Sequence, residues 1–590
     1  MPTSRASTPT RPATRLSDTG TPRRSPLPKL CAAAALVMQA MAALAQTPAE
    51  LQQIDRLQRE EQQRQQRQFE RDRSSARPPV SLQPEAAQKP VRRPAGPCHL
   101  ITDIRLNGAG LLIESTRDRL LRPYLGQCLG VSDIERLMGD VTAHYVNRGY
   151  IAARVYLGPQ DLSSGRLELT VVEGILKTLR IEDGGAQSIS PANTFPWVSG
   201  RVLDLRDIEQ GLDQVNRLAS NNATMSIEPG AQPGESDVVV TNTPGNRWHL
   251  TATADTFGSK PTGRAQGSVT ASLDNVMGFD DFVSVTDRRT LHPDGNRRNS
   301  VSDSVTYTIP FGWTLLSTGL SYSSYASVFR TPANLEMHST GNAKNAYLRA
   351  DRVVYRDRDN LLTLSGTVTR KESTTFLAEQ RVDVSSRALT VGDLDLSLRT
   401  RAAGGVLFLG AGLSHGLRWF NALDDADHLP DTAPHAQFDK QRASASWSRQ
   451  FALGGSSLDI GSQISGQYSK QVLYGSEQMS VGGVYSVRGF EDSSLANDIG
   501  WMWRNDVGLT TPMQVGSLAG SWRPYLGLDT GRVRGRHQDG DAGRLSGAAL
   551  GLQLRVAKVA LDTYVMAPIG GHSAFPDAKA SVQASLSISF

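Results

Sequence analysis

The chain ends with Val582-Gln583-Ala584-Ser585-Leu586-Ser587-Ile588-Ser589-Phe590, in which apolar and small polar residues alternate without interruption. A period of two places the two sets of side chains on opposite faces of a β-strand. One face is apolar and ends in an aromatic residue, whereas the other carries Gln583 and three serines. This pattern suits the closing strand of an outer-membrane barrel. A half-buried strand of a soluble β-sandwich fits the same nine residues equally well.

The composition restricts how such a chain could enter a membrane. A length of 590 residues exceeds a single hydrophobic core, so two to four domains are expected. No apolar run reaches the roughly 18–20 residues of a membrane-spanning helix. Because only helices and closed barrels satisfy every backbone group in lipid, a membrane protein of this composition must be a barrel.

Residues 1–45 are predicted to be a secretory signal peptide. A basic segment leads into the apolar run Leu30–Met38, and Ala43-Leu44-Ala45 precedes Gln46 as a cleavage site. Cys31 stands at the beginning of this run, where a lipoprotein cysteine would follow it, which excludes a lipoprotein signal. The net charge of these residues is +5, which equals that of the whole chain, so the remainder is neutral. That neutrality removes the electrostatic case for a nucleic-acid partner.

Two cysteines, Cys98 and Cys128, remain after the signal is removed. In an oxidising compartment, two cysteines within one small domain are expected to pair. The bond would close a loop of about 31 residues and stabilise the fold by roughly 3–4 kcal/mol. Two free buried thiols are the alternative.

Residues 46–76 are predicted to form a polar helix, followed by a Pro-rich extended linker over residues 77–97. Leu51, Ile54 and Leu57 form a thin apolar stripe, and good helix formers fill the rest. A helix that is polar nearly all round either stands alone in solvent or lines a wet space. Both possibilities remain open from the residues alone.

Two similar units follow, over residues 98–174 and 175–245, and each has the order strand–helix–helix–strand–strand. Within the first unit, Ser132 and Glu135 form a capping-box pattern at the start of the longer helix. The expected elements of the first unit are a strand at Ile101–Leu106, helices at Ser115–Tyr124 and Ser132–Arg148, and strands at Ala152–Leu157 and Arg166–Val172. Those of the second are a strand at Leu176–Ile181, a helix at Asp204–Ala219, and strands at Thr224–Glu228 and Asp237–Thr241.

Residues 246–590 show short alternating segments separated by Gly, Asp, Asn and Pro. Trp248–Ala254, Gly267–Leu273, Val301–Ile309 and Leu361–Val368 are examples. The region is too long for one ordinary sandwich. About 16 antiparallel strands of about 10 residues, or roughly 21 residues for each strand with its connection, account for this length in a transmembrane β-barrel.

Three short motifs in this order give the chain a family resemblance. Leu157–Gly174 resembles the end of a first POTRA domain, Gly482–Phe490 the signature of a sixth surface loop, and Gly527–Gly531 a G-x-D-x-G of the barrel wall. Together they resemble the two-partner secretion transporters (TpsB type, haemolysin/haemagglutinin secretion-activation) of the POTRA-barrel superfamily. The resemblance covers essentially everything after the signal.

The resemblance implies a role for each motif. The sixth loop would fold into the pore, where Arg488 would pair with Asp529 on the inner wall, between Gly527 and Gly531. A guanidinium and a carboxylate suit that contact because they can bond through two donors and two acceptors. Val487, Gly489 and Phe490 would complete this loop–barrel lock. Two solvated loop charges are the alternative for Arg488 and Asp529.

The remaining implications concern topology. The helix at 46–76 would plug the pore, the two POTRA units would lie in the periplasm, and Phe590 would serve as a barrel-assembly signal of the outer membrane of a Gram-negative cell. The last strand would close against the first, near Trp248–Ala254.

The function expected from this resemblance is a passive pore that secretes a large partner exoprotein. That partner, a haemolysin, an adhesin or a contact-dependent toxin, would bear an N-terminal secretion domain and be captured by β-augmentation. Other expected partners are outer-membrane lipid and the barrel assembly machinery, and a monomer with no cofactor and no metal is expected. A factor that assembles other barrels is the alternative. A barrel enzyme is a third possibility, but Asp280 and Asp281, the candidate carboxylate pair, are expected to be solvated turn residues.

Overall fold

The computed structural model describes residues 97–295, 297–330, 334–536, 542–570 and 575–590. The predicted signal peptide, the predicted helix at 46–76 and residues 77–96 of the predicted linker lie outside these ranges. Within the described ranges, no helix is both long and apolar enough to cross a membrane.

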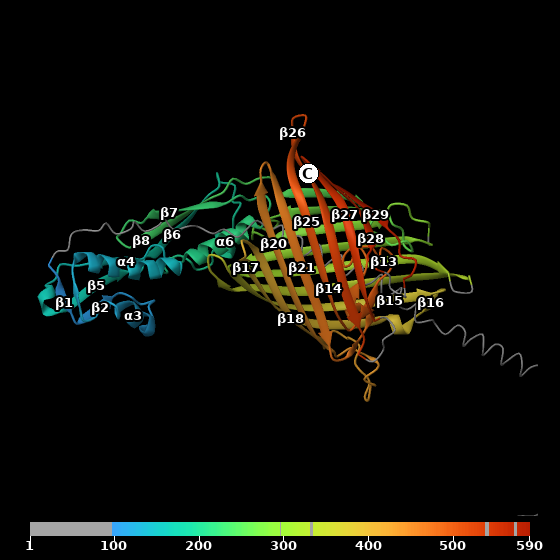
Figure 1. The fold of residues 1–590 in the computed structure, drawn as a ribbon, viewed down its shortest axis with the longest axis horizontal. Coiled ribbons are helices and arrows are strands. Elements are labelled where there is room, and N and C mark those ends of the chain that lie inside the picture. Colours follow the sequence, from blue (N-terminus) through green and yellow to red (C-terminus); the bar gives the residue numbers. More distant parts are fainter. Residues whose placement is uncertain (1–96, 296, 331–333, 537–541, 571–574) are drawn as a thin grey trace, which may run out of the picture. The chain divides into compact units, whose positions relative to one another are not determined.

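The first unit packs two helices against a three-stranded sheet (Figure 1). The sheet order is β2 (Asp103–Asn107), β5 (Arg166–Val172), β4 (Arg154–Leu157), with β2 and β5 parallel. Its helices are α3 (Glu114–Leu121) and α4 (Val131–Asn147), and η1 is Leu162–Ser164. The predicted strand Ile101–Leu106 is divided at Thr102, because β1 (His99–Ile101) leaves the sheet and pairs with β3 (Gln127–Leu129).

The start of α4 differs from the predicted capping box. The N-cap is Gly130, whose N–H donates to Asp133 Oδ2 at 3.1 Å. Because the helix begins one residue earlier than predicted, Ser132 already lies in the first turn, and the acidic residue at the third helical position is Asp133 rather than Glu135. The predicted Ser132–Glu135 cap is therefore wrong, although the helix itself is confirmed.

The second unit repeats this architecture. Its sheet order is β6 (Ile175–Glu182), β8 (Glu235–Thr241), β7 (Thr224–Pro229), and its helices are α5 (Pro191–Thr194) and α6 (Leu205–Asn216). Asp204 caps α6, because its side chain accepts a hydrogen bond from Arg206 N at 2.8 Å.

The rest of the described chain is a closed antiparallel barrel of sixteen strands, as predicted (Figure 1). Short turns join the strands at the end where the first barrel strand begins, and mostly longer loops join them at the other end. A two-residue strand, β16 (Gln380–Arg381), pairs antiparallel with the end of β15 in the connection between β15 and β17. The barrel strands are β9 (Trp248–Asp255), β10 (Gln266–Asp274), β11 (Phe282–Thr290), β12 (Asn299–Phe311), β13 (Thr314–Arg330), β14 (Glu336–Arg356), β15 (Leu361–Leu377), β17 (Arg387–Ala402), β18 (Gly405–Leu417), β20 (Asp439–Leu453), β21 (Ser456–Ser469), β25 (Ile499–Val515), β26 (Leu518–Arg534), β27 (Gly543–Val556), β28 (Val559–Pro568) and β29 (Ser581–Ser589).

The C-terminal strand β29 closes the barrel against β9, with Leu586 opposite Ala254. Phe590 extends this pairing, because its N–H donates to Leu250 O at 2.8 Å. Val582 is 64% exposed on the outer face, whereas the neighbouring Gln583 is fully buried. The alternation that opened the sequence therefore belongs to a barrel and not to a sandwich.

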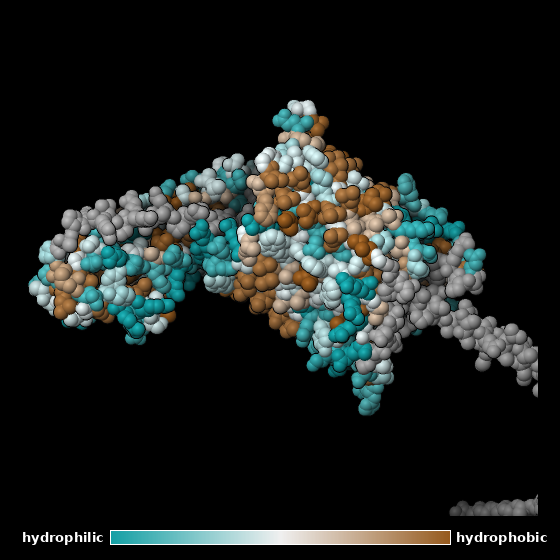
Figure 2. All heavy atoms as spheres, in the orientation of Figure 1, coloured by the Kyte–Doolittle hydropathy of each residue, from teal (hydrophilic) through white to brown (hydrophobic). Residues whose placement is uncertain are grey.

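Large apolar side chains are exposed on the outer faces of many other strands, and apolar surface covers much of the barrel in Figure 2. Examples are Leu320 on β13, Leu348 on β14, Leu413 on β18 and Leu550 on β27. An outward apolar surface of this kind is what a membrane-spanning barrel requires.

The connection between β21 and β25, residues 470–498, is here called the long loop. It contains β22 (Val472–Leu473), η3 (Gly475–Glu477), β23 (Met479–Val481) and β24 (Leu495–Asn497). β23 pairs with β24 inside the loop, and β22 pairs in parallel with β19 (Pro434–His435) of the loop that precedes β20. These pairings give a long surface connection a defined backbone path.

Candidate functional site

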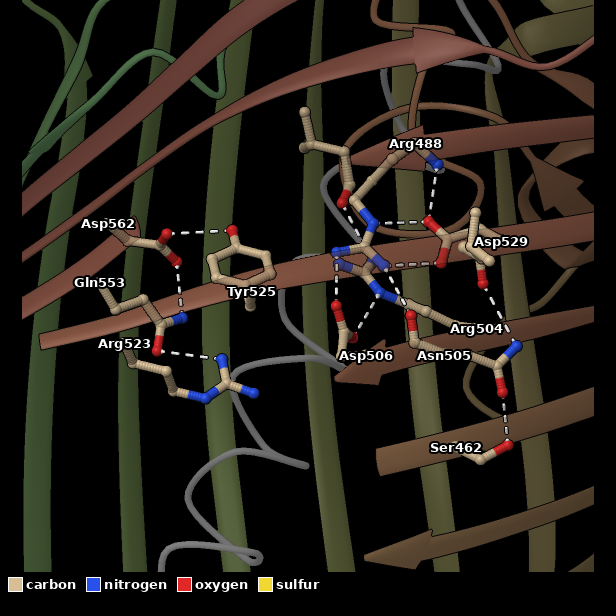
Figure 3. A network of polar contacts seen from close by, with 12 residues as sticks. Ser462, Arg488, Arg504, Asn505, Asp506, Arg523, Tyr525, Asp529, Gln553 and Asp562 are labelled. Carbon is tan, nitrogen blue, oxygen red and sulfur yellow. Dashed lines mark hydrogen bonds and ion pairs between the residues drawn. The ribbon is translucent and has the colours of Figure 1, made fainter. Parts of the chain in front are cut away.

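The tip of the long loop places Arg488 against the inner wall of the barrel (Figure 3). On β26, Leu526 and Leu528 are exposed outside, so alternation turns Gly527 and Asp529 inward. Arg488 Nε lies 2.6 Å from Asp529 Oδ2, and Arg488 Nη2 lies 2.7 Å from Asp529 Oδ1. This is a bidentate, charge-assisted contact.

Two further contacts surround the same arginine. Its backbone N–H donates to Asp529 Oδ2 at 3.1 Å, and its Nη1 lies 2.7 Å from Asp506 Oδ1 on β25. Arg488 is only 2% exposed. One cation is thus shared by two carboxylates on adjacent strands, so the guanidinium is neutralised where it is shielded from solvent.

Glycines allow the loop to approach the wall this closely. Gly489 has a φ of +106°, and a Cβ there would lie 2.5 Å from Ala567 O. A Cβ on Gly527 would meet the guanidinium of Arg488, and one on Gly547 of β27 would meet the Arg488 carbonyl. A Cβ on Gly531 would lie 2.9 Å from Val481 Cγ1. Side chains at these positions would therefore push the loop away from the wall.

Apolar side chains surround the charged contact on one side. Val487 and Phe490 are buried in one cluster with Val533 of β26 and Leu545 of β27. The Phe490 ring centroid lies 6.4 Å from that of Phe575. Phe490 therefore packs against the barrel wall beside the charged contact.

The long loop has two other ionic attachments. Glu477 lies between Lys371 of β15 and Lys440 of β20, with Oε–Nζ distances of 2.6 Å and 2.9 Å. After Arg488 in the sequence, Glu491 and Asp492 each lie 2.7 Å from Arg264 of the β9–β10 loop. The loop is thus held by charged groups at three places around the barrel.

Polar side chains continue along the inner wall beside the tip (Figure 3). Tyr525 Oη donates to Asp562 Oδ1 at 3.1 Å, and Gln553 Nε2 donates to Asp562 Oδ2 at 3.1 Å. Arg523 Nε lies 3.3 Å from Asp459 Oδ2. A wall lined by these polar side chains suits a water-filled lumen, because it presents no apolar surface at this place to a polar backbone.

The remaining predicted site residues lie elsewhere. Cys98 and Cys128 form a disulfide that joins β1 to β3, with a Cα–Cα distance of 5.3 Å. Phe590 lies at the barrel seam, 53% exposed, with Lys558 Nζ 5.5 Å from its ring centroid.

The expectation that Asp280 and Asp281 are solvated is wrong, because both are fully buried. Asp281 accepts hydrogen bonds from Met277 N at 3.0 Å and Phe279 N at 3.3 Å within the β10–β11 turn. Asp280 Oδ2 accepts from Ser190 N at 2.7 Å, and burial raises the pKa of Asp280 to about 7. These carboxylates satisfy backbone groups. In the described part of the chain, no cluster of three or more His, Cys, Asp or Glu residues could hold a metal ion.

Sequence reasoning missed Asp506, Gly547 and Glu477. Alternation along β25 could have indicated Asp506, because it places this acidic residue on the inner face, next to Val507 on the outer face. Gly547 and Glu477 gave no local signal, because their partners are 59 and at least 37 residues away in sequence.

Comparison with known proteins agrees with this architecture. Residues 234–554 match the family described as haemolysin secretion/activation protein ShlB/FhaC/HecB. Residues 99–174 match the ShlB-type POTRA domain, and residues 175–229 match another POTRA model.

Individual relatives cover most of the chain. It is 32% identical to the hemolysin transporter protein ShlB of Serratia marcescens, over 84% of this chain and 85% of that protein. It is 34% identical to the outer membrane transporter CdiB of Dickeya dadantii, over 70% and 72% of the two chains. The solved structure of CdiB from Escherichia coli superposes with a TM-score of 0.80 at 30% identity, covering 91% of this chain and 98% of that one. The chain therefore belongs to the ShlB/FhaC/HecB family, the outer-membrane transporters of two-partner secretion, and its POTRA domains are periplasmic.

Proposed function

We propose that this pore secretes one large exoprotein, a haemolysin, an adhesin or a contact-dependent toxin that bears an N-terminal secretion domain. The relatives named as hemolysin and CdiB transporters support this cargo class. They also favour secretion over the assembly of other barrels. The single observation that carries the mechanism is the buried contact of Arg488 with Asp529 and Asp506, which ties a lumen loop to the wall.

Capture of the cargo begins at the POTRA units. The β4 strand forms one edge of the first sheet, so its outer backbone groups can pair with an extended segment. Tyr156 and Leu157 on this strand are 53% and 45% exposed, which offers apolar contacts beside that edge. An unfolded chain arriving from the inner membrane supplies the extended segment.

The cargo then passes outward through the barrel without ATP and without any enzymatic step, and its folding outside provides direction. The helix at 46–76 plugs the resting pore, and the linker at 77–97 lets it lie apart from the POTRA units at 98–174 and 175–245. The transporter acts as a monomer in lipid, after insertion of the 246–590 barrel by the assembly machinery through a signal that includes Phe590. The lock formed by Val487, Arg488, Gly489 and Phe490 against Gly527, Asp529 and Gly531 holds the closed conformation.

The test is Arg488→Ala, with Arg532→Ala as the matched control. Arg532 is exposed on the same strand as Asp529. We expect Arg488→Ala to lower secretion of the partner sharply while the barrel still reaches the membrane and keeps its heat-modifiable mobility. Secretion at the level of the control would refute the lock. A general loss of other outer-membrane proteins in a deletion strain would instead favour the assembly-factor function.

A further inference from the structure

The part of the long loop that precedes its tip is attached to the barrel by a buried ion triad. Glu477 is 3% exposed, and Lys440 is 8% exposed. Lys440 Nζ donates both to Glu477 Oε2 at 2.9 Å and to Glu477 O at 3.2 Å, while Lys371 Nζ donates to Oε1 at 2.6 Å. β15 and β20 are not neighbours in the barrel, so Glu477 joins two separate parts of the wall.

Backbone pairing holds the same part of the loop. Val472 pairs with Pro434 and Leu473 with His435 in the parallel β19–β22 bridge, which ties the loop to its neighbour on the surface. Leu473 also packs with Val391 of β17 and with Phe438, and its N–H donates to Asp498 Oδ1 at 2.9 Å. We call residues 470–481 the root. Ladder bonds and a buried triad together make the root an extension of the wall.

The tip, residues 482–494, is attached in a different way. Its polar attachments to the barrel each involve a side chain on at least one side: Arg488 bonds to Asp529 and Asp506, and the carboxylates of Glu491 and Asp492 bond to Arg264. Val487 and Phe490 add apolar packing against the wall, but among the described residues no strand ladder joins the tip to the barrel. Such contacts can break and re-form as units, without rebuilding a strand ladder.

The boundary between root and tip is a glycine pair. Gly482 and Gly483 have φ values of +114° and +89°, which other L residues adopt only at a cost. A Cβ on Gly483 would meet nothing within 4 Å, so there is open space around it. Hinges lie at positions that absorb large φ/ψ changes, and a glycine pair between two unequal attachments has that property.

We propose that the long loop is divided at Gly482–Gly483 into a fixed root and a movable tip, and that Glu477 is the positioning residue that fixes the root. The inference rests on the secretion pore proposed above. When Arg488 leaves Asp529, the tip swings about the glycines, whereas the root stays in the wall. Glu477 thereby sets which part of the lumen opens for the cargo.

The first test removes the charge of the root triad by Glu477→Gln. The matched control is Glu372→Gln, since Glu372 is adjacent to Lys371 on β15 but half exposed and outside the triad. In planar bilayers, the open-time fraction of Glu477→Gln is expected to rise by about tenfold or more, because the buried Lys440 and the partly exposed Lys371 lose their charged partner. The control should match the wild type.

The second test replaces the triad with a covalent bond. Pro434 and Val472 are register partners, so cysteines at both positions lie within the Cα separation that a disulfide spans. The oxidised Pro434→Cys/Val472→Cys pair should restore the low open fraction of Glu477→Gln, and in the native background it should leave partner secretion unchanged. Wild-type protein treated with the same oxidant and reductant controls for the native Cys98–Cys128 bond.

Two outcomes would overturn the division of the loop: secretion that stops on oxidation and returns on reduction, or an open fraction of Glu477→Gln that the cross-link does not lower. Arg488→Ala separates this result from the proposed function. If that variant secretes normally, the lock itself fails. If Arg488→Ala stops secretion and the root cross-link also stops secretion, the proposed secretion function is retained and the fixed root is refuted.

Discussion

Gly547→Ala on β27 should displace the tip of the long loop from the barrel wall without changing any charged residue. A Cβ at this position would lie at less than half the ordinary ~3.3 Å separation from the Arg488 carbonyl oxygen. That oxygen belongs to the loop tip, whereas Gly547 belongs to the strand ladder, opposite Asp529 and Pro568. Because the ladder is held by many hydrogen bonds, the loop rather than the strand is expected to move.

The size of the effect follows from the contacts that this movement breaks. A retreat of about 2 Å lengthens the 2.6 Å and 2.7 Å contacts of Arg488 with Asp529 beyond hydrogen-bond range. Separating the partners of a buried ion pair costs about 3–5 kcal/mol, and water in the lumen favours the lower end of that range. Since 1.4 kcal/mol is tenfold, the population of the seated loop should fall by about two orders of magnitude relative to the unseated one.

The assay is the open-time fraction of single channels in planar bilayers, together with heat-modifiable mobility as a check on barrel assembly. Gly366→Ala on β15 is the matched control, because a Cβ at Gly366 would meet nothing within 4 Å. We expect Gly547→Ala to open far more often than the control while both barrels stay folded. Equal open fractions in two folded variants would refute the close seating of the loop tip on β27.

Three other predictions concern parts away from the tip. Deletion of residues 48–73 should raise the mean conductance in planar bilayers if this segment is the plug that we propose; an unchanged conductance would contradict the plug. Cys98→Ser/Cys128→Ser should lower the stability of the first POTRA unit by roughly 3–4 kcal/mol, seen as faster proteolysis of that unit in the full-length protein, and an unaltered cleavage rate would argue against a stabilising bond. Burial raises the pKa of Asp204 to about 6, so the stability it contributes is fully present below its ordinary value of 3.8 and is lost as the pH rises through 6. After correction for the intrinsic pH dependence of amide exchange, the protection factors of α6 should therefore fall from pH 5 to pH 7 in the wild type, and Asp204→Asn should flatten that fall; the same fall in both proteins would refute the assignment.

The barrel could be predicted from the sequence because its signal is local. Alternation with a period of two is visible within each strand, so both faces of β29 followed from its nine residues. Its closure against β9 was expected only from the family resemblance. The helices of the POTRA units were also recognisable from local patterns. Their exact starts were not, as α4 shows, because neighbouring residues compete to cap a helix.

The site was less predictable because its partners are distant in sequence. The pairing of Arg488 with Asp529 came from a family resemblance, and nothing near Arg488 indicates that Asp506 shares it. Asp280 is buried against a backbone group at Ser190, 90 residues earlier, whereas Asp281 is buried against the backbone of its own turn. No local sequence pattern indicates that another part of the chain will cover a turn. Polar turn residues are therefore expected to be exposed to solvent, and here that expectation is wrong.

The unequal lengths of the barrel strands have a consequence for the cell surface. β14 has 21 residues, whereas β9 has 8. At about 3.3 Å per residue and a tilt near 45°, β14 rises about 50 Å, roughly twice the height of the apolar band of an outer-membrane barrel. Its turn with β15 lies at the periplasmic end, so the excess of the β13–β14 hairpin stands above the lipid on the outside. An epitope inserted at the end of this hairpin should therefore be accessible to antibodies on intact cells. A cargo that leaves the pore would then contact the hairpin on one side of the barrel and solvent on the other side.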